Sequence, residues 1–361
     1  VVSEPIVPFQ IHTSNTNTAT DDRATATFRA DVLPAGIKLD PITGIISGRP
    51  TVAKPTGYSF KVFAKNPMGE TLGVPVTLIV NAIPDKIVGS CMGHVAQDSV
   101  INPRGGRVDF SIAATGVVTG KFLLGITSYS FTGALNTSFA TPDVSTAVIP
   151  ITPTNLVFSF TYTGSTGKLS TATLTNGSNT ATVTGWHNIW NPAPLVKPYA
   201  GYYTMAFNPP APQTNPVPLG HGYASFTIAT TGTLSVSGVL ADGTPFTTAG
   251  FVGPEGEVLV YQMLYTNKGS ILGLLDIAPG SLADFSDSTL TGSAIWTRDP
   301  VIPSTVNRTY TVGFTNATVT AFGGRYKVIA ATEIMMYLPD QAGNAILDFD
   351  QGGLGSNAND P

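Results

Sequence analysis

Residues 33–51, LPAGIKLDPITGIISGRPT, constrain the fold more than any other part of this chain. Ile37–Leu39 places a lysine between two apolar residues, the period of two that is typical of a half-buried strand. Residues 40–44, DPITG, supply turn chemistry, because proline presets φ and glycine accepts φ > 0. Residues 45–47 resume an extended pattern, and Gly-Arg-Pro at 48–50 ends it. The sequence therefore predicts a strand–turn–strand hairpin.

The residues around this hairpin continue the same β pattern. Tyr58–Lys65 alternates apolar and polar residues, so its apolar side chains are predicted to share one face. A closing strand over residues 72–80 alternates in the same way. Pro75 within it predicts an edge position, because proline cannot donate to the ladder. Residues 1–84 are therefore predicted to form an immunoglobulin-like β-sandwich.

Through LPAGIKLDPITGIISGRPT and the strands around it, residues 9–81 resemble the putative-immunoglobulin, cadherin-like domain that is repeated in large secreted bacterial surface proteins. The sequence departs from the usual pattern at Ile37, where leucine is common, and at Arg49, where threonine is common. The resemblance implies an immunoglobulin-like sandwich in an extracellular, cell-surface setting. It implies no ligand.

An internal repeat follows within residues 85–338. Residues 106–120, GRVDFSIAATGVVTG, and residues 222–238, GYASFTIATTGTLSVSG, match at a constant offset through phenylalanine, isoleucine, threonine and glycine. Each copy predicts a hairpin, and further strands follow each one, among them a strand over Tyr310–Phe314 in the second half. We expect a duplicated β-barrel or large β-sandwich with halves at about 87–207 and 219–338, because so many strands exceed what an open sheet holds comfortably.

This second region resembles an uncharacterised all-β repeat that accompanies such immunoglobulin-like domains in large bacterial surface proteins. The phrases GHGYASFTI, GVLADGTPF, KGSILGLL and GGRYKV carry that resemblance. The Pro-rich stretch 208–219 is predicted to connect the two halves. Residues 339–361 are predicted to be a tail or the start of a further segment. The predicted fold class is thus all-β throughout.

Composition narrows the classes of partner. Charged residues make up 11% of the chain, against roughly 25% in an average soluble domain. The net charge of −4 gives no electrostatic reason to expect nucleic acid or an anionic membrane surface. No apolar run approaches the length of a transmembrane helix, so membrane insertion is not predicted. Cys91 is the single cysteine, so no disulfide can form within the chain.

Aromatic residues are the candidates for ligand binding. Trp186, Trp190, Tyr202 and Tyr203 could stack on sugar rings if their faces were exposed in loops. The alternative is that one tryptophan plugs a barrel end and the other caps a Pro-rich loop.

Other polar groups are weaker candidates for metal binding or catalysis. Cys91 and His94 have a spacing that could suit a metal or a nucleophile–base pair, but further ligands are distant in sequence, so no metal site is predicted. A carboxylate pair for glycoside hydrolysis, or a calcium site, would need convergent acidic groups, and solvated turn positions are the favoured interpretation of both. The acidic residues concerned are Glu255, Glu257, Asp284 and Asp287 for hydrolysis, and Asp31, Asp40, Asp85, Asp340, Asp348, Asp350 and Asp360 for calcium.

The sequence therefore favours a non-enzymatic, extracellular structural or adhesive segment of a large bacterial surface protein. Its expected partners are other copies of itself or other surface proteins, and it would assemble into a filament or lattice by β-strand contacts through edge strands or the N-terminal segment Val1–Ile11. A carbohydrate-binding module is the alternative, with polysaccharide as the partner. A polysaccharide-degrading enzyme is a weaker one.

Overall fold

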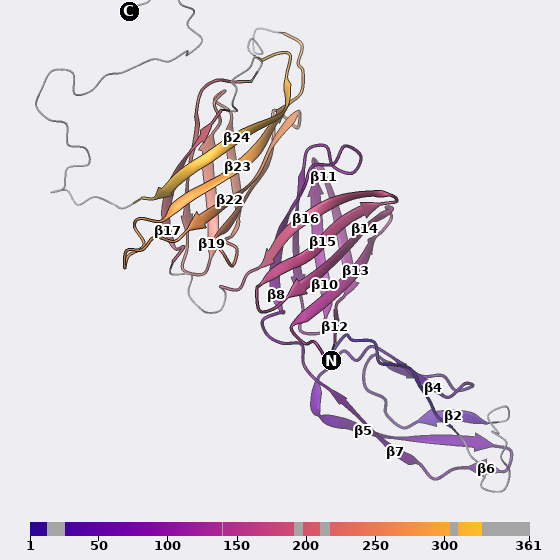
Figure 1. The fold of residues 1–361 in the computed structure, drawn as a ribbon. Coiled ribbons are helices and arrows are strands. Elements are labelled where there is room, and N and C mark those ends of the chain that lie inside the picture. Colours follow the sequence, from indigo (N-terminus) through magenta and orange to yellow (C-terminus); the bar gives the residue numbers. More distant parts are fainter. Residues whose placement is uncertain (13–25, 139, 191–197, 210–216, 304–309, 327–361) are drawn as a thin grey trace, which may run out of the picture. The chain divides into compact units, whose positions relative to one another are not determined.

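The computed structural model describes residues 1–12, 26–138, 140–190, 198–209, 217–303 and 310–326. These residues form strands and no α-helix (Figure 1), so the predicted all-β class is confirmed. None of them provides a helix long and apolar enough to cross a membrane. The chain divides into two compact units, the first made of residues 1–92, 108–122 and 128–187, and the second of residues 93–107, 123–127 and 188–361.

The N-terminal domain is an immunoglobulin-like sandwich of two small sheets. One sheet has the order β1-β4-β3, and the other has the order β2-β5-β6 with β7 also paired to β5. The strands are β1 Phe9–Gln10, β2 Thr27–Ala30, β3 Ile37–Leu39, β4 Ile45–Gly48, β5 Lys54–Asn66, β6 Gly69–Glu70 and β7 Val74–Val80. The core between the sheets is built on Ile37, Ile46, Phe60 and Val62, all at most 6% exposed.

The predicted hairpin is the β3–β4 pair. Oδ1 of Asp40 accepts hydrogen bonds from the amides of Ile42 (2.8 Å) and Thr43 (3.0 Å), so the aspartate organises the turn. At the other end of the hairpin, Gly48 has φ +130°, and a Cβ there would lie 2.2 Å from the carbonyl oxygen of Gly36. The hairpin thus depends on a side-chain-to-backbone turn at one end and on glycine at the other.

The closing strand is shorter than predicted. β7 begins at Val74, whereas Leu72 lies before it and is 93% exposed. Val76 and Leu78 pack against the core, and Val80 is 1% exposed. Among the described strands, β7 pairs with β5 alone and is therefore an edge strand. Pro75 is compatible with this edge position because proline has no backbone N–H to donate.

The first large sheet has nine strands in the order β11-β10-β9-β8-β16-β15-β14-β13-β12 (Figure 1). Its core contains Phe110, Phe122, Phe131 and Phe158, with ring centroids 4.9–6.3 Å apart in the contacting pairs. The strands are β8 Gly89–Val95, β9 Gly106–Ile112, β10 Val117–Leu124, β11 Thr127–Ala134, β12 Asn136–Thr137, β13 Val144–Ile151, β14 Leu156–Thr163, β15 Lys168–Asn176 and β16 Asn179–His187.

The second large sheet repeats this topology with eight strands in the order β20-β19-β18-β17-β24-β23-β22-β21. In both sheets the first four strands along the chain form one half and the last four form the other. The first sheet has one additional short strand, β12, at its edge. In each sheet the last strand along the chain pairs with the first. The strands are β17 Gly201–Asn208, β18 Gly222–Ile228, β19 Thr233–Val239, β20 Pro245–Phe251, β21 Glu257–Leu264, β22 Gly269–Ala278, β23 Thr289–Arg298 and β24 Phe314–Arg325.

The repeated sequence corresponds to two turns with the same hydrogen bonds. The amide of Gly116 donates to Ala113 O (2.8 Å), and that of Gly232 donates to Ala229 O (2.9 Å). The two glycines have φ values of 77° and 82°. Each glycine carbonyl then accepts a bond from further along its own half, from Leu135 N at Gly116 and from Val252 N at Gly232. The similarity of the two halves therefore extends to their backbone hydrogen bonds.

The boundary between the halves differs from the predicted one. β17 belongs to the second sheet, because it pairs with β18 and β24, so the change of sheet lies between His187 and Gly201. The Pro-rich stretch 208–219 was predicted as the connection, but it joins β17 to β18 within the second sheet, and most of it lies outside the described residues.

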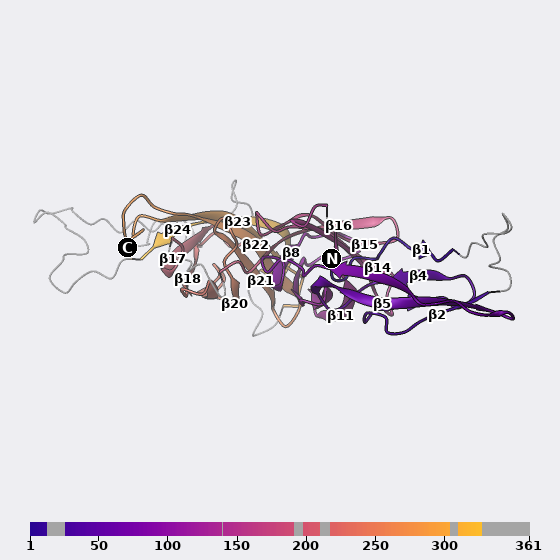
Figure 2. The ribbon, with the colours of Figure 1, turned by 90° about the horizontal axis from the view of Figure 1, so that it is seen from below.

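The second sheet curls until its two end strands, β20 and β21, are neighbours (Figure 2). They do not form a continuous ladder. The amide of Thr247 on β20 instead donates to Oε1 of Gln262 on β21. The result is a nearly closed barrel filled by side chains, among them Phe226, Val236 and Trp296.

Replacement of Gly48 tests the close approach in the hairpin. Gly48→Ala should lower the free energy of unfolding of the N-terminal domain by about 1–3 kcal/mol, because an L-residue is strained at this φ and its Cβ would contact Gly36 O. Hydrogen exchange of the β3–β5 amides in the full chain measures it. Gly69→Ala is the matched control, because Gly69 also has positive φ (145°) but a Cβ at this position would meet no atom within 4 Å. Equal losses in both variants would contradict the steric argument.

Candidate functional site

Three of the four predicted sugar-stacking residues are buried. Trp186 on β16 is 1% exposed, and Trp190 is 8% exposed. Tyr203 on β17 is 0% exposed and stacks on Phe226, with centroids 5.0 Å apart and planes 7° apart. With so little exposed area, these three side chains do not form the surface platform that sugar stacking needs, and the buried alternative fits them.

Trp190 has the role of a plug. Its Nε1 donates to Val252 O (3.0 Å), its ring packs edge-on against Tyr199 at 5.7 Å, and the turn at Gly232 lies against it. It belongs to the core of the second sheet. Tyr202 is the exception among the four, because it is 42% exposed on the outer side of β17. Its ring meets Tyr326 edge-to-face at 5.8 Å.

Cys91 and His94 lie on β8, where residues three apart point to opposite faces. Cys91 is 2% exposed, and burial raises the pKa of its thiol, which leaves it poorly suited to act as a nucleophile. Burial lowers the pKa of His94 to about 4. Its Nδ1 has no hydrogen-bond partner in the described structure. Among the described residues, no three histidine, cysteine or acidic side chains gather as a metal site would require.

The candidate carboxylates for hydrolysis lie in loops or, for Glu257, at the first residue of β21, and three of them accept hydrogen bonds from nearby residues of the chain. Oε2 of Glu257 accepts from the amide of Glu255 (2.8 Å). Asp287 accepts from the amide and hydroxyl of Ser281 and from the amide of Leu282, at 2.8–3.1 Å. Burial alone would raise the pKa of Asp287, but these hydrogen bonds outweigh it and lower the pKa. Asp284 accepts from Ser286 in the same loop. These contacts are those of turn-forming residues.

The candidate calcium ligands are also turn residues where they are described. Asp31 accepts from the amides of Lys61 (2.7 Å) and Val32 (2.8 Å), which lower its pKa, and Asp40 organises the β3–β4 turn. Asp85 precedes β8 in the segment between the domains. The remaining candidates, Asp340, Asp348, Asp350 and Asp360, lie outside the described residues.

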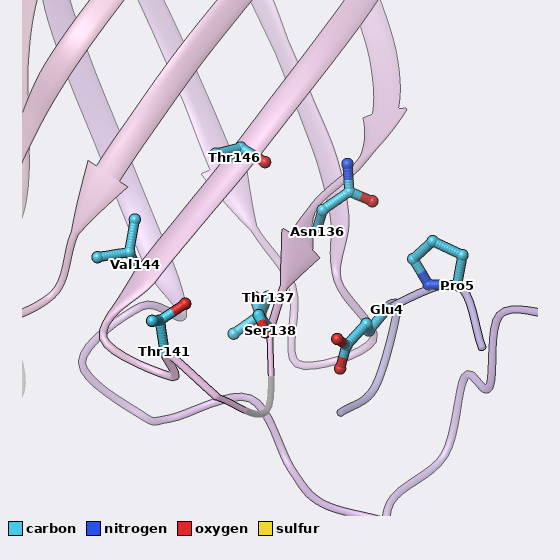
Figure 3. A pocket seen from close by; sticks show the side chains of 8 residues that line it. All are labelled: Glu4, Pro5, Asn136, Thr137, Ser138, Thr141, Val144 and Thr146. Carbon is cyan, nitrogen blue, oxygen red and sulfur yellow. The ribbon is translucent and has the colours of Figure 1, made fainter. Parts of the chain in front are cut away.

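A pocket of about 290 Å³ lies in the first unit between the N-terminal segment and β12–β13 (Figure 3). Glu4 and Pro5 line one side, and Asn136, Thr137 and Ser138 face them. Glu4 is the one carboxylate among its lining residues, and it pairs with the amino group of Val1 at 3.0 Å. The pocket therefore lacks the second carboxylate that glycoside hydrolysis needs.

A buried polar network, which the sequence did not reveal, lies at one end of the second barrel. Oδ2 of Asp242 accepts from the hydroxyl of Tyr265 (2.6 Å) and lies 3.3 Å from Nη1 of Arg298. Arg298 also stacks over the Tyr265 ring at 4.7 Å, and Nε1 of Trp296 donates to the Tyr265 hydroxyl (2.9 Å). Burial, followed by the hydrogen bond to Asp242, raises the pKa of Tyr265.

This network connects the two sides of the seam between β20 and β21. Asp242 lies in the β19–β20 turn, and Tyr265 follows β21 directly. The sequence signal was the phrase LADGT, which is typical of a turn in which the aspartate is solvated. The curling of the sheet brings Tyr265 and Arg298 against this carboxylate. Sequence spacing alone therefore could not identify the network.

Comparison with known protein families supports the immunoglobulin-like assignment of the N-terminal domain. Residues 2–81 match the model of the family described as Putative Ig domain. The predicted resemblance of this domain to the putative-immunoglobulin family is therefore confirmed. Domains of this kind are typical of extracellular proteins and are usually non-enzymatic. No curated protein and no solved structure matches the chain.

Loss of the charge of Asp242 tests the network. Asp242→Asn should lower the free energy of unfolding by about 3 kcal/mol, because it leaves Arg298 buried without its counter-charge. Urea denaturation followed by tryptophan fluorescence measures the loss. Asp299→Asn is the control, since the Arg104–Asp299 pair is more exposed and should change stability by less than about 1 kcal/mol. Similar values for both variants would contradict a special role for the seam.

Acid should destabilise the protein through His94. The folded state holds the pKa of this imidazole near 4 against an ordinary 6.5, so its contribution to stability is complete above about pH 6.5 and declines as pH falls. Between pH 7.5 and pH 5 the loss should be about 2 kcal/mol. His94→Gln should remove this component of the pH dependence. Because burial also lowers the pKa of His187, an acid effect of the same sign should remain in this variant.

Proposed function

We propose that this chain is a non-enzymatic structural or adhesive segment of a larger extracellular surface protein. It associates with other copies of itself through a β-strand edge. The family match of residues 2–81 supports the extracellular setting. The observation that carries the proposal is the open edge of β7.

Within the described ranges, one edge of β7 has no neighbouring strand, and apolar side chains lie beside it. It pairs with β5 alone among the described strands. Val74 is 57% exposed, and Ile79 is 61% exposed. A groove of about 240 Å³ runs between β7 and the N-terminal segment, lined mainly by Ile6, Val7, Leu78 and Ile79. A strand from a second copy would pair with the free N–H and C=O groups of β7 and bury these side chains.

The N-terminal segment is not free to act as the donated strand, in contrast to our expectation for Val1–Ile11. The amide of Val2 donates to Asn81 O (2.9 Å), that of Ile6 to Gly48 O (3.0 Å), and that of Ile11 to Gly44 O (2.9 Å). Val2 is 1% exposed. The segment therefore completes its own domain and forms one wall of the groove, which leaves β7 as the edge for pairing.

Sedimentation velocity of the full chain over increasing concentration tests this assembly. The wild-type chain should form dimers or longer species, and Ile79→Lys should raise the dissociation constant at least about tenfold, a loss of about 1.4 kcal/mol, because a lysine on an edge opposes pairing. Val117→Lys is the matched control. Val117 is 39% exposed on β10, which is paired on both sides by β9 and β11. A chain that stays monomeric at high concentration would overturn the proposal.

A further inference from the structure

Among the described residues, four exposed aromatic rings gather on the outer side of β17, β18 and β24, three of them on these strands and one directly after β24. Tyr202, Tyr223, Phe322 and Tyr326 are 42%, 64%, 50% and 41% exposed, respectively. Among the described residues, one other aromatic side chain, Phe9 at 39%, is comparably exposed. We call these four side chains the aromatic face. Isolated exposed apolar residues are ordinary, but rings gathered along three adjacent strands and the end of one of them indicate a binding surface.

The strand register places these rings in two pairs. Ala206 on β17 lies opposite Tyr223 on β18 and opposite Phe322 on β24, so these two rings flank a small residue at about 10 Å from each other. At the other end of β17, Tyr202 contacts Tyr326 edge-to-face, and Tyr326 N donates to Tyr202 O (2.7 Å). About 13 Å of strand separates Ala206 from Tyr202.

Small and hydroxyl-bearing residues fill the space between the pairs. Thr204 lies opposite Ser225 on one side and Gly324 on the other. These positions leave no large side chain between the two pairs of rings. The pairs therefore lie along one continuous strip of the sheet. Three of the rings are on strands, and Tyr326 directly follows β24 and is hydrogen bonded to Tyr202, which fixes their spacing before any ligand binds.

Within the part of the chain that the structure describes, the outward strand positions around these rings are uncharged. The outward positions of β19, β18, β17, β24 and β23 carry threonine, serine, glycine, alanine, asparagine, valine and isoleucine besides the rings, and no acidic or basic side chain. The two strand-end arginines are directed elsewhere, Arg298 to Asp242 and Arg325 to the carbonyl of Asp284 (2.8 Å). His221, beyond the end of β17, is hydrogen bonded to Asn208 (3.0 Å).

From this chemistry we infer that the aromatic face binds a neutral polysaccharide. A pyranose ring has an apolar C–H face that packs on an aromatic ring, and hydroxyls at its rim that pair with threonine and serine. A face without charge gives no electrostatic attraction to acidic polymers, nucleic acid or anionic lipid headgroups. A protein partner would need a contiguous apolar core within about 800 Å² on each side, whereas hydroxyls and glycine separate these rings.

This inference does not depend on the proposed self-association, because it concerns different strands and a different ligand. The test is affinity electrophoresis of the full chain in gels that contain soluble β-glucan, mannan or xylan, with anionic polygalacturonate for comparison. At least one neutral polymer should retard the wild-type chain, and added salt should not weaken the retardation.

Paired substitutions identify the surface. Tyr202→Ala/Tyr326→Ala and Tyr223→Ala/Phe322→Ala should each weaken binding at least about tenfold. Ala206→Glu should abolish it by placing a charge between the rings of Tyr223 and Phe322. Phe9→Ala, which removes the exposed ring elsewhere, should bind like the wild type. Urea denaturation of each variant verifies that the fold is retained.

Several results would overturn the inference. These are no retardation by any of the three neutral polymers, retardation by polygalacturonate alone that salt removes, or unchanged binding by both double variants. Loss of self-association in those variants, without any glycan binding, would assign the face to a second copy of the chain instead.

Discussion

The pairing of the last strand of each large sheet with its first is the constraint on which the rest of this molecule depends. β24 pairs with β17, and β16 lies beside β8 in the other sheet. Each of these pairs joins residues about a hundred positions apart and unites two four-stranded halves that could not close a core alone. The loop-closure entropy of such a contact is recovered only when both halves are in place, so folding of each barrel is expected to be slow and cooperative.

This pairing also determines where the sheet remains open. The fourth and fifth strands of each sheet become its edges, and in the second sheet the twist brings them together. In the second barrel the seam is held by side chains, with Gln262 accepting from Thr247 N and Asp242 joined to Tyr265 and Arg298. A sheet that closes through side chains avoids a long exposed edge, and its polar network fixes the register of the two edges.

Local patterns in the sequence predicted the hairpin at residues 33–51, the strand containing Tyr58–Lys65, and the repeated Thr-Gly turns, because their determinants lie within a few residues. The strand predicted at 310–314 was wrong, since Tyr310 and Gly313 form a turn and β24 runs from Phe314 to Arg325. The alternating Thr and Ala of 315–321 carried the real signal. The boundary of the duplication was also misplaced, because strand exchange between halves is decided by pairing that no local window contains.

The candidate sites show the same limit. Period-two alternation already requires Tyr202 and Tyr203 to point to opposite faces, as do Cys91 and His94, so neither pair could act together. Which of Tyr202 and Tyr203 is exposed depends on which side of β17 faces the core. The grouping of Tyr202 with Tyr223, Phe322 and Tyr326 depends on the neighbouring strands, which come from both ends of the second half. The sequence identifies candidate aromatic residues, but strand pairing in the sheet determines which of them lie side by side.

The adjacency of first and last strands has a mechanical consequence. Tyr203 pairs with Arg325, so the chain enters and leaves the second barrel at the same end of one antiparallel ladder. In the N-terminal domain, Val2 likewise bonds Asn81. A pulling force applied along the chain therefore loads these hydrogen bonds one after another in an unzipping geometry, rather than all at once in shear. Such modules yield at low force and extend, which makes each a compliant element when the chain is under tension.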